Sequence, residues 1–561
     1  MLWGGLYLAF AGWMGTKPPS VAAGSIAASG PDAACAQCHQ AISERYEATP
    51  MARASGSAED GFLPADFTHA ASGIHYTVTK DGGRVWLSYE RPDATANREL
   101  AGRVELRYYV GSGLRGRTYL FEREGYWFEA PINWYGKKRV WDMAPNFLSA
   151  REMPLTLRVD PGCLHCHASE VAESLPDARN HYTGEPFGAG GIRCASCHGD
   201  GAAHVASGGK VKMMDLDALE PVRRDSICLN CHLEGEAAVI RAGKREDEFR
   251  PGDDLFDYAV FFVRQRESGS EGRATSQWEA LLKSRCKQAS GDRMTCTTCH
   301  DPHGGPAPEE REAYYRAKCL QCHNANSFVE KHHPENPDCA ACHMERMTSS
   351  DIAHEQVTDH WIRKEIGGPE PARATSGPLV AVGGVAADDR DLGLAYAQMA
   401  ARGDEAAGQK AMRLLARAER TSGGAANDAI LHEQLGFLEQ INGDVGNAAA
   451  EYKTALRADP QDLLAAGDLA VLDAKARDYG NAVRLWQEVF AQDPAQREAG
   501  IDLALVEDAG GEHAAALATL ERLQEFAPDD GQARALAAQI RKRILAAEPE
   551  PGPHLGGGPA R

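Results

Sequence analysis

The stretch Cys194-Ala195-Ser196-Cys197-His198 contains the pattern that decides how this chain folds. Two cysteines are separated by two residues, and a histidine directly follows the second cysteine. This Cys-x-x-Cys-His pattern occurs seven times and accounts for all but one of the 15 cysteines. Random placement at the chain's own Cys and His frequencies would give about 0.01–0.02 matches. The pattern therefore cannot be accidental, and only Cys286 stands outside it.

The spacing of the pattern is that of covalent haem attachment. Two thiols on one helical turn reach the two vinyl groups on one haem edge and form thioethers, and the next residue supplies a proximal imidazole to iron. A zinc site instead needs two such cysteine pairs and no histidine after each. We therefore predict seven covalently attached haem c groups, one at each motif, and number the motifs in chain order.

The predicted attachment cysteines and proximal histidines are the following: Cys35, Cys38 and His39 in motif 1; Cys163, Cys166 and His167 in motif 2; Cys194, Cys197 and His198 in motif 3; Cys228, Cys231 and His232 in motif 4; Cys296, Cys299 and His300 in motif 5; Cys319, Cys322 and His323 in motif 6; and Cys339, Cys342 and His343 in motif 7.

Histidines outside the motifs are candidates for the sixth ligand of each iron. Seven are needed for full bis-histidine coordination, and ten precede residue 366: His69, His75, His165, His181, His204, His303, His332, His333, His354 and His360. His204 is the strongest candidate because it closely follows motif 3. His303 lies three residues after a proximal histidine, so we expect it to serve a neighbouring haem. His354 and His360 follow the last motif and are also good candidates.

The other candidates have two interpretations each. For His69, His75, His181, His332 and His333, an ordinary surface or core role explains the residue as well as a ligand role does. Met51 follows His39 by twelve residues and is either a packed side chain or a methionine ligand, which would raise that haem's potential. Cys286 is either a structural buried thiol or an axial or redox-active thiolate.

The N-terminus and the charge bear on where the protein acts. An apolar run over residues 1–14 is followed by small residues, which is typical of a signal peptide or a short anchor, although no Lys or Arg precedes the run. Haem c is attached outside the cytoplasm, so we expect a periplasmic or extracellular protein, with membrane contact only through such an anchor. The formal charge of −20 argues against nucleic acid and against a basic lipid-binding patch.

Strand patterns lie between the first two motifs. Residues 75–79 and 84–89 flank an Asp81-Gly82-Gly83 turn, which predicts a β-hairpin. Residues 104–110, 118–121 and 126–128 continue the pattern. These stretches predict a small antiparallel sheet.

The last third of the chain repeats with a period of 34 residues. Pro460, Pro494 and Pro528 have this spacing, and the repeated alanines, leucines and bulky residues keep it: Ala448, Ala482 and Ala516; Leu435, Leu469 and Leu503; Tyr452, Trp486 and Leu520. A 34-residue period with a Leu-Gly step is typical of tetratricopeptide repeats (TPR). We predict three repeats over 429–530, between a helical pair at 391–420 and a terminal helix at 531–545; the alternative is an unrelated helical bundle.

The predicted fold is multi-domain: a haem-packed, loop-rich multihaem cytochrome with a small antiparallel β region, followed by an all-α TPR solenoid. The predicted divisions are 1–30, signal peptide or short anchor; 31–160, first haem and β region; 161–365, six haems; 366–390, linker; 391–545, TPR domain; and 546–561, disordered tail.

Several stretches resemble known families. The Cys-x-x-Cys-His-Gly-x-Gly-x-x-His stretch at 194–204 resembles the tetrahaem cytochromes of ammonia oxidation and their multihaem relatives. The stretch at 296–303, ending in His-Asp-Pro-His, is similar to doubled-CxxCH proteins. The block at 109–120 resembles that of bacterial multihaem cytochromes with C-terminal TPRs. The resemblance implies haems in alternating near-parallel and near-perpendicular pairs, with distal histidines supplied from a different motif's neighbourhood.

Two functions fit these features. The first is electron relay between redox partner proteins, with the TPR domain as a docking surface for a protein or peptide. The alternative is an oxidoreductase acting on a small nitrogen or sulfur compound at one five-coordinate haem. The pentahaem nitrite reductases have a Cys-x-x-Cys-Lys motif, and no motif here ends in lysine. The number of candidate distal histidines also favours relay.

Overall fold

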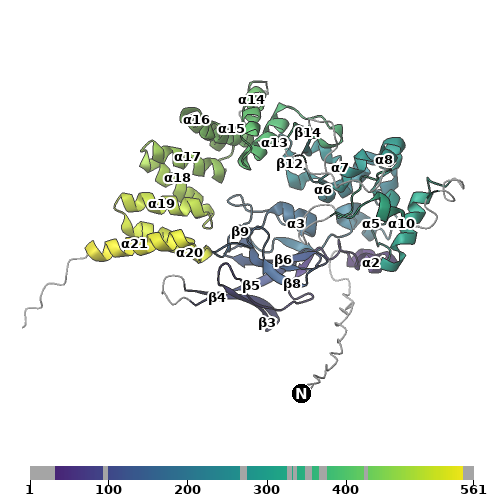
Figure 1. Cartoon of the computed structure of the whole chain (residues 1–561), viewed down its shortest axis with the longest axis horizontal. Helices are drawn as coiled ribbons and strands as arrows, with labels where there is room; N and C mark the ends of the chain where they lie inside the picture. Colours follow the sequence, from purple (N-terminus) through teal and green to yellow (C-terminus); the bar gives the residue numbers. More distant parts are fainter. Residues whose placement is uncertain are drawn as a thin grey trace, which may run out of the picture.

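The computed structural model describes residues 32–92, 99–265, 274–324, 332, 338–347, 357–364, 374, 376–421 and 427–547. The predicted signal segment, most of the predicted tail, His333 and His354 lie outside these residues. In Figure 1 a β-sheet, a region of short helices and an arc of paired helices follow one another along the chain. Within the described part, no helix combines the length and apolarity needed to cross a membrane.

The β-sheet is antiparallel and has the strand order β2-β3-β4-β5-β6-β7-β8, with β1 paired to β5 and β9 to β7. The predicted hairpin is confirmed as β3 and β4, and both turn glycines, Gly82 and Gly83, have positive φ. The sheet is larger than the small one predicted. Its strands are β1 (Ser55–Ser57), β2 (Ala65–Thr68), β3 (His75–Asp81), β4 (Arg84–Arg91), β5 (Leu100–Val110), β6 (Gly116–Arg123), β7 (Tyr126–Tyr135), β8 (Val140–Met143) and β9 (Leu157–Arg158).

Strand β7 is buried on both sides, because the two faces of the sheet pack against different parts of the chain. Neighbouring residues on a strand point to opposite faces. Phe128 packs in a core that includes Phe526 from the helical arc. Trp127 packs in a second core with Leu164, which lies inside motif 2. The sheet therefore carries motif 2 on one face and the end of the arc on the other.

The six motifs after residue 160 lie in a region of short helices and small strands. Its helices, with the first motif included, are α1 (Ala33–Ala36), α2 (Gln40–Tyr46), α3 (Pro161–His167), α4 (Ala195–His198), α5 (Ala202–Ala206), α6 (Pro221–His232), α7 (Gln277–Lys283), α8 (Arg285–Ser290), α9 (Cys296–Cys299), α10 (Arg311–Leu320) and α12 (Cys339–His343). Its 3-10 helices are η1 (Leu216–Ala218), η2 (Glu246–Glu248), η3 (Leu255–Asp257), η4 (Gly291–Arg293) and η5 (Pro308–Glu310). Its strands are β10 (Ala168–Val171), β11 (Phe187–Gly190), β12 (Ala237–Ile240) and β13 (Ala259–Arg264).

Part of the predicted linker at 366–390 is structured instead. Leu379–Ala381 forms β14, which pairs with β13, and η6 (Val382–Gly384) follows. The reason is burial: Leu379 packs beside Phe262 in the core shared with the first helices of the arc. Val382 joins a separate core beside motif 4. The three-stranded sheet β12-β13-β14 thus connects the motif region to the arc.

The arc consists of antiparallel helix pairs, as the 34-residue period predicts. The helices are α13 (Asp389–Ala401), α14 (Glu405–Thr421), α15 (Ala429–Ile441), α16 (Val445–Ala458), α17 (Leu463–Lys475), α18 (Tyr479–Gln492), α19 (Arg497–Ala509), α20 (His513–Phe526) and α21 (Gly531–Ala547). The repeated alanines are fully buried between helices. A Cβ atom at Gly436 would lie 2.6 Å from the Tyr452 ring, so this step between helices requires glycine.

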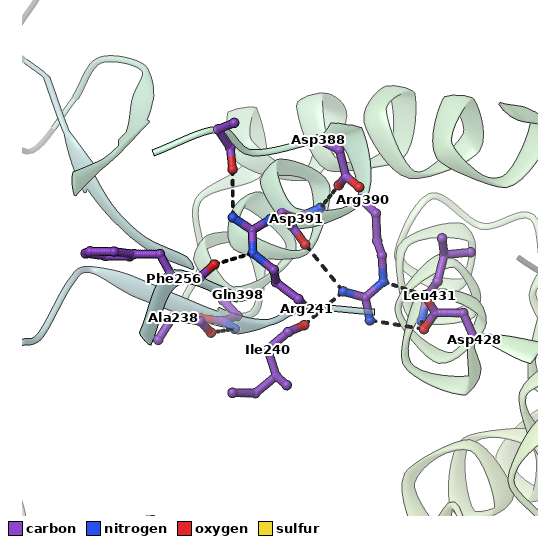
Figure 2. Close-up of polar contacts among 11 residues, drawn as sticks. Ala238, Ile240, Arg241, Phe256, Asp388, Arg390, Asp391, Gln398, Asp428 and Leu431 are labelled. Carbon is purple, nitrogen blue, oxygen red and sulfur yellow. Dashed lines mark hydrogen bonds and ion pairs between the residues drawn. The ribbon is translucent and has the colours of Figure 1, made fainter. Parts of the chain in front are cut away.

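The first end of the arc is joined to the three-stranded sheet by two arginines, the buried Arg390 and the partly buried Arg241 (Figure 2). Arg390 forms an ion pair with Asp428 and donates a hydrogen bond to the Ile240 carbonyl at 2.9 Å. Arg241, at the end of β12, forms an ion pair with Asp391 at 2.9 Å. These contacts and the shared apolar core fix α13 against the motif region.

The second end is joined to the large sheet by a buried charge cluster. The Asp529 side chain is fully buried and accepts hydrogen bonds from Arg91 on β4, from Arg534 and from the Met153 backbone. Tyr126 donates a hydrogen bond to the Gln492 carbonyl at 2.6 Å beside this cluster. Both ends of the arc are therefore attached to the rest of the chain.

Replacing Asp529 should loosen the second junction. Asp529→Ala leaves Arg91 buried without its carboxylate, which costs about 3–5 kcal/mol in the free energy of unfolding. Chemical denaturation followed by the helical circular-dichroism signal measures this loss. Glu488→Gln, which breaks the exposed Arg484–Glu488 pair, is the control and should change stability by less than about 1 kcal/mol. Equal effects of the two variants would contradict a central role for Asp529.

A buried carboxylate should make the arc sensitive to pH. Burial raises the pKa of Glu433 on α15 to about 7. Folded protein then holds the Glu433 proton more tightly than unfolded protein does, so the stability that this proton contributes is lost as pH rises from about 4.5 to 7. Glu433→Gln should be more stable than the parent at pH 8, by up to about 3 kcal/mol, and similar to it at pH 4.5. A pH-independent difference in denaturation midpoint would contradict this.

Candidate functional site

Each motif forms a single helical turn. The backbone amides of the motif histidines donate to the carbonyl four residues earlier, for example His198 to Cys194 at 2.9 Å and His300 to Cys296 at 3.0 Å. One turn places both cysteines and the histidine on one side of the backbone. This is the local geometry that thioether attachment and proximal ligation need.

The motif cysteines differ in how far they are buried. Cys38 of motif 1 and Cys322 of motif 6 are exposed, and the other motif cysteines are partly buried. Cys38 lies just beyond α1, and its backbone amide donates to the Cys35 carbonyl at 3.2 Å. Cys342 of motif 7 lies within α12, one residue before the end of that helix. The predicted thioether attachment at Cys38 and at Cys342 is compatible with these positions and stays a prediction.

Four motif histidines face a histidine from outside the motifs. In each pair the two rings come from different segments of the chain. The ring centres are 6.4 Å apart for His39 and His204, 5.9 Å for His198 and His303, 6.2 Å for His300 and His360, and 5.7 Å for His343 and His332. The planes are inclined by 20°, 15°, 31° and 19° respectively.

These separations fit two imidazoles on opposite sides of one iron. A metal–imidazole bond is about 2 Å long and the bonding nitrogen lies about 1.1 Å from the ring centre, so trans imidazoles place their ring centres about 6.3 Å apart. The four observed distances lie within about 0.6 Å of that value. The residues present therefore fit a bis-histidine haem at each pair.

Hydrogen bonds orient several of these rings. His204 Nδ1 lies 2.7 Å from the Val211 carbonyl, His343 Nδ1 lies 2.6 Å from the Arg363 carbonyl, and His360 Nδ1 lies 2.8 Å from the Thr358 carbonyl. A carbonyl only accepts, so Nδ1 carries the proton in each ring. Nε2 is then the nitrogen with the lone pair, as an iron ligand requires.

Burial favours the neutral imidazole at these positions. Burial lowers the pKa of His198, and the neighbouring His303 and His39 lower it further. Burial also lowers the pKa of His300 and of His360. Because metal binding requires the unprotonated ring, this environment prepares the side chains as ligands.

Two of the other candidate histidines have structural partners. His69 uses both ring nitrogens, with Nδ1 2.8 Å from the Ser72 hydroxyl and Nε2 3.0 Å from the Leu148 carbonyl. His181 Nδ1 lies 2.6 Å from the Asp177 carboxylate. Both residues thus hold the β region together, which is the ordinary role considered for them.

His75, His165 and Met51 also have identifiable contacts. His75 lies on β3, and its Nδ1 is 3.1 Å from the Thr68 hydroxyl. The Asn230 amide contacts His165 Nε2 at 2.6 Å and so connects motif 4 to motif 2. The Met51 carbonyl accepts a hydrogen bond from Ile192 at 2.9 Å, next to motif 3. The methionine-ligand prediction stays a prediction.

His332 faces the motif histidine His343, although the sequence placed it among the weaker candidates. It precedes motif 7 by seven residues, whereas the favoured candidates follow a motif. Its position before the motif gave no signal in the sequence, because a histidine that faces a motif histidine has no fixed spacing from it. His354 lies outside the described residues, so its predicted role is untested.

Cysteines of different motifs are neighbours, and they link the motifs in an unbroken series. First cysteines contact each other between motifs 1 and 3, 4 and 5, and 6 and 7, and second cysteines do so between motifs 2 and 4. Second cysteines are electrostatic neighbours between motifs 3 and 4 and between motifs 5 and 6. The contacts or electrostatic neighbours are Cys35 with Cys194, Cys228 with Cys296, Cys319 with Cys339, Cys166 with Cys231, Cys197 with Cys231, and Cys299 with Cys322. The spatial order is thus 1-3-4-5-6-7, with motif 2 beside motif 4.

The cysteine contacts do not form zinc sites. Structural zinc takes four ligands, commonly two complete Cys-x-x-Cys pairs. Among the described residues, no group of three or more cysteines lies close enough to hold one ion; the group nearest to this is Asp32, Cys35 and Cys194, with ligand atoms within 4.8 Å of one another. No disulfide forms among the fifteen cysteines, all of which the structure describes.

Cys286 lies on α8 next to motifs 5 and 6. Burial raises its thiol pKa, and the neighbouring Cys322 raises it further. A raised pKa disfavours the thiolate. This environment supports the structural interpretation of Cys286 over the redox-active one.

Two known sequence families match parts of the chain. Residues 289–328 match the doubled CXXCH motif, and this match includes motifs 5 and 6. Residues 474–540 match the tetratricopeptide repeat. The first match indicates covalently bound haem c of the multihaem cytochrome kind. The second confirms the repeat type, which generally mediates contacts between proteins.

Comparison with curated proteins found no match. Solved structures similar to part of the chain include MamA AMB-1, with 21% identity over 28% of this chain and 81% of that one, and a TM-score of 0.25. The MamA RS-1 ArsTM double mutant has 18% identity over 28% and 98% of the two chains, and a TM-score of 0.23. No functional conclusion follows from these similarities.

Proposed function

We propose that this chain is an exported heptahaem c-type cytochrome that relays electrons between redox partner proteins. The observation that carries the proposal is the unbroken series of neighbouring motifs, 1-3-4-5-6-7 with motif 2 beside motif 4. Haems attached at neighbouring motifs lie close together, so an electron can pass along the series without leaving the protein. The formal charge of −20 argues against a nucleic-acid partner.

The proposed ligands follow from the histidine pairs. His39, His198, His300 and His343 are the proximal ligands of four irons, and His204, His303, His360 and His332 are their distal ligands. The proximal ligands of the other three irons are His167, His232 and His323. With two imidazoles an iron has no position open for a substrate, which favours relay over catalysis at these four sites.

The protein's contribution is to hold and tune the bound groups. Axial ligands, hydrogen bonds to those ligands, burial and nearby charge set the potential of each haem. The carbonyls of Val211, Thr358 and Arg363 make the ligand nitrogens of their histidine partners more electron-rich. Such tuning would grade the potentials along the series.

The helical repeats are the proposed docking surface for a redox partner. Both ends of the arc are attached to the same chain, so the middle helices α15 to α19 are the part that a partner protein or peptide would contact. Several large apolar side chains on these helices are exposed, among them Ile430, Leu464, Tyr479 and Leu505. The arc would hold the partner at a fixed distance from the haem series.

The haem count can be tested directly on the exported protein. Mass spectrometry under denaturing conditions should show seven added haem groups, because thioethers survive unfolding. Alkylation of the same unfolded protein should then modify one cysteine, Cys286, since the other fourteen, from Cys35 and Cys38 to Cys339 and Cys342, are bonded to haem. Fewer haems, or alkylation at a motif cysteine, would contradict the count of seven.

The ligand assignment can be tested by spin state. Electron paramagnetic resonance of the oxidised wild type should show low-spin iron throughout. His204→Ala should convert one iron to high spin by removing its distal ligand. The control His75→Ala, a histidine on strand β3, should leave the spectrum unchanged. High-spin iron in the wild type would favour the alternative of an oxidoreductase, and an unchanged His204→Ala spectrum would overturn the assignment.

A further inference from the structure

Three motifs are preceded by an aspartate at the same spacing. Asp32, Asp160 and Asp225 each stand three residues before the first cysteine of motifs 1, 2 and 4. An aspartate at this spacing is well placed to cap the motif's own helix turn. The structure shows that only one of the three is used in that way.

Asp32 reaches across to another motif. It occupies the position before α1, yet its side chain makes no capping hydrogen bond to that helix. Instead its Oδ1 accepts a hydrogen bond from the backbone amide of Cys194 at 3.1 Å. Asp32 is 6% exposed, and its second oxygen is buried without a hydrogen-bond partner. The carboxylate therefore connects motif 1 to the start of motif 3 from a buried position.

Asp225 makes the same connection between motifs 4 and 5. It lies inside α6, is 3% exposed, and its Oδ1 accepts a hydrogen bond from the backbone amide of Cys296 at 3.3 Å. In both cases the acceptor comes from one motif and the donor is the first cysteine of a later one. A hydrogen bond from the first cysteine's amide to an aspartate that precedes an earlier motif thus occurs at two independent places in the chain.

The same two motif pairs bring their first cysteines together. Ligand atoms of Asp32, Cys35 and Cys194 lie within 4.8 Å of one another. The thiols of Cys228 and Cys296 also interact with each other. Asp32 and its two sulfur atoms therefore form one compact unit, whereas Asp225 is joined to motif 5 through the Cys296 amide.

Asp160 shows that the spacing alone does not create this unit. Its Oδ1 accepts from Gly162 at 2.8 Å within its own helix α3, and its side chain is 57% exposed beside Arg179. Asp160 is thus an ordinary helix cap. It provides a matched control with identical spacing and no connection to another motif.

We propose that Asp32 and Asp225 are positioning residues, which clamp motif 1 to motif 3 and motif 4 to motif 5 and whose charge lowers the reduction potentials of the haems attached there. The inference rests on the proposed haem attachment. The hydrogen bond to the cysteine amide fixes where each thioether begins, and so fixes the spacing of the two haems. A buried negative charge beside both haems favours the oxidised, more positive irons.

The charges of Asp32 and Asp225 should affect the haem potentials to different extents. The Lys287 ammonium lies near Asp225 and partly offsets its charge. The second oxygen of Asp32 is buried without a hydrogen-bond partner. Neutralising Asp32 should therefore shift potentials more than neutralising Asp225.

The test compares Asp32→Asn, Asp225→Asn and Asp160→Asn in the full-length, haem-loaded protein. Asparagine keeps the acceptor oxygen and removes the charge. In a spectroelectrochemical titration, Asp32→Asn should affect the haems of motifs 1 and 3, which contribute two-sevenths of the absorbance change. At fixed potential the reduced-to-oxidised ratio of these two haems should rise about tenfold, which corresponds to a midpoint potential about 59 mV higher. Asp225→Asn should give a smaller rise, about threefold. Asp160→Asn should match the wild type.

Asp32→Ala tests the clamp itself, because alanine also removes the hydrogen bond to Cys194. In Asp32→Ala, the paramagnetic resonance signals of the haems at motifs 1 and 3 should change. In Asp160→Ala, the signals of these same two haems should not change. Unchanged signals with seven haems would overturn the clamp, and a titration equal to that of Asp160→Asn would overturn the charge effect.

If a variant loses haem, alkylation mapped to Cys35 or Cys194 supports the clamp, and alkylation only elsewhere overturns it. Loss of haem in the wild type would instead contradict the proposed function.

Discussion

Four motif histidines each face a second histidine ring among the described residues, with ring centres 5.7–6.4 Å apart, and the proposed iron ligation depends on this geometric constraint. Each of these four motifs contributes one histidine, so the second ring must come from outside the motif. The chain meets the constraint by supplying the second ring from elsewhere, as with His204 for motif 1 and His303 for motif 3. Each such pair joins two segments, so the constraint also determines how the motifs are arranged.

The same arrangement explains why the motif region has little regular structure of its own. Its helices are short, and the longest described helix that carries a motif is α6, with 12 residues. Helices of this length are marginal alone and depend on tertiary contacts. Here the contacts pass between motifs, through cysteine neighbours, the histidine pairs and the buried carboxylates Asp32 and Asp225.

The helical arc connects two separate parts of the motif region. One end packs on the three-stranded sheet beside motif 4, and the other packs on the large sheet that carries motif 2. Motifs 2 and 4 are themselves neighbours. The packed elements thus form a closed ring, and the arc holds the two ends of the motif region in one relative position.

Much of this was determined by the sequence alone. Covalent chemistry fixes the spacing of Cys-x-x-Cys-His, and close helix packing fixes the 34-residue period, so the motifs, the repeats and the 75–89 hairpin can be found locally. Local spacing cannot decide contacts between distant segments. The pairing of His198 with His303, the strand at Leu379–Ala381 within a predicted linker, and the order 1-3-4-5-6-7 all depend on such contacts. The three aspartates make the same point: Asp32, Asp160 and Asp225 have one spacing in the sequence, and only burial in the tertiary structure separates the two that join motifs from the one that caps a helix.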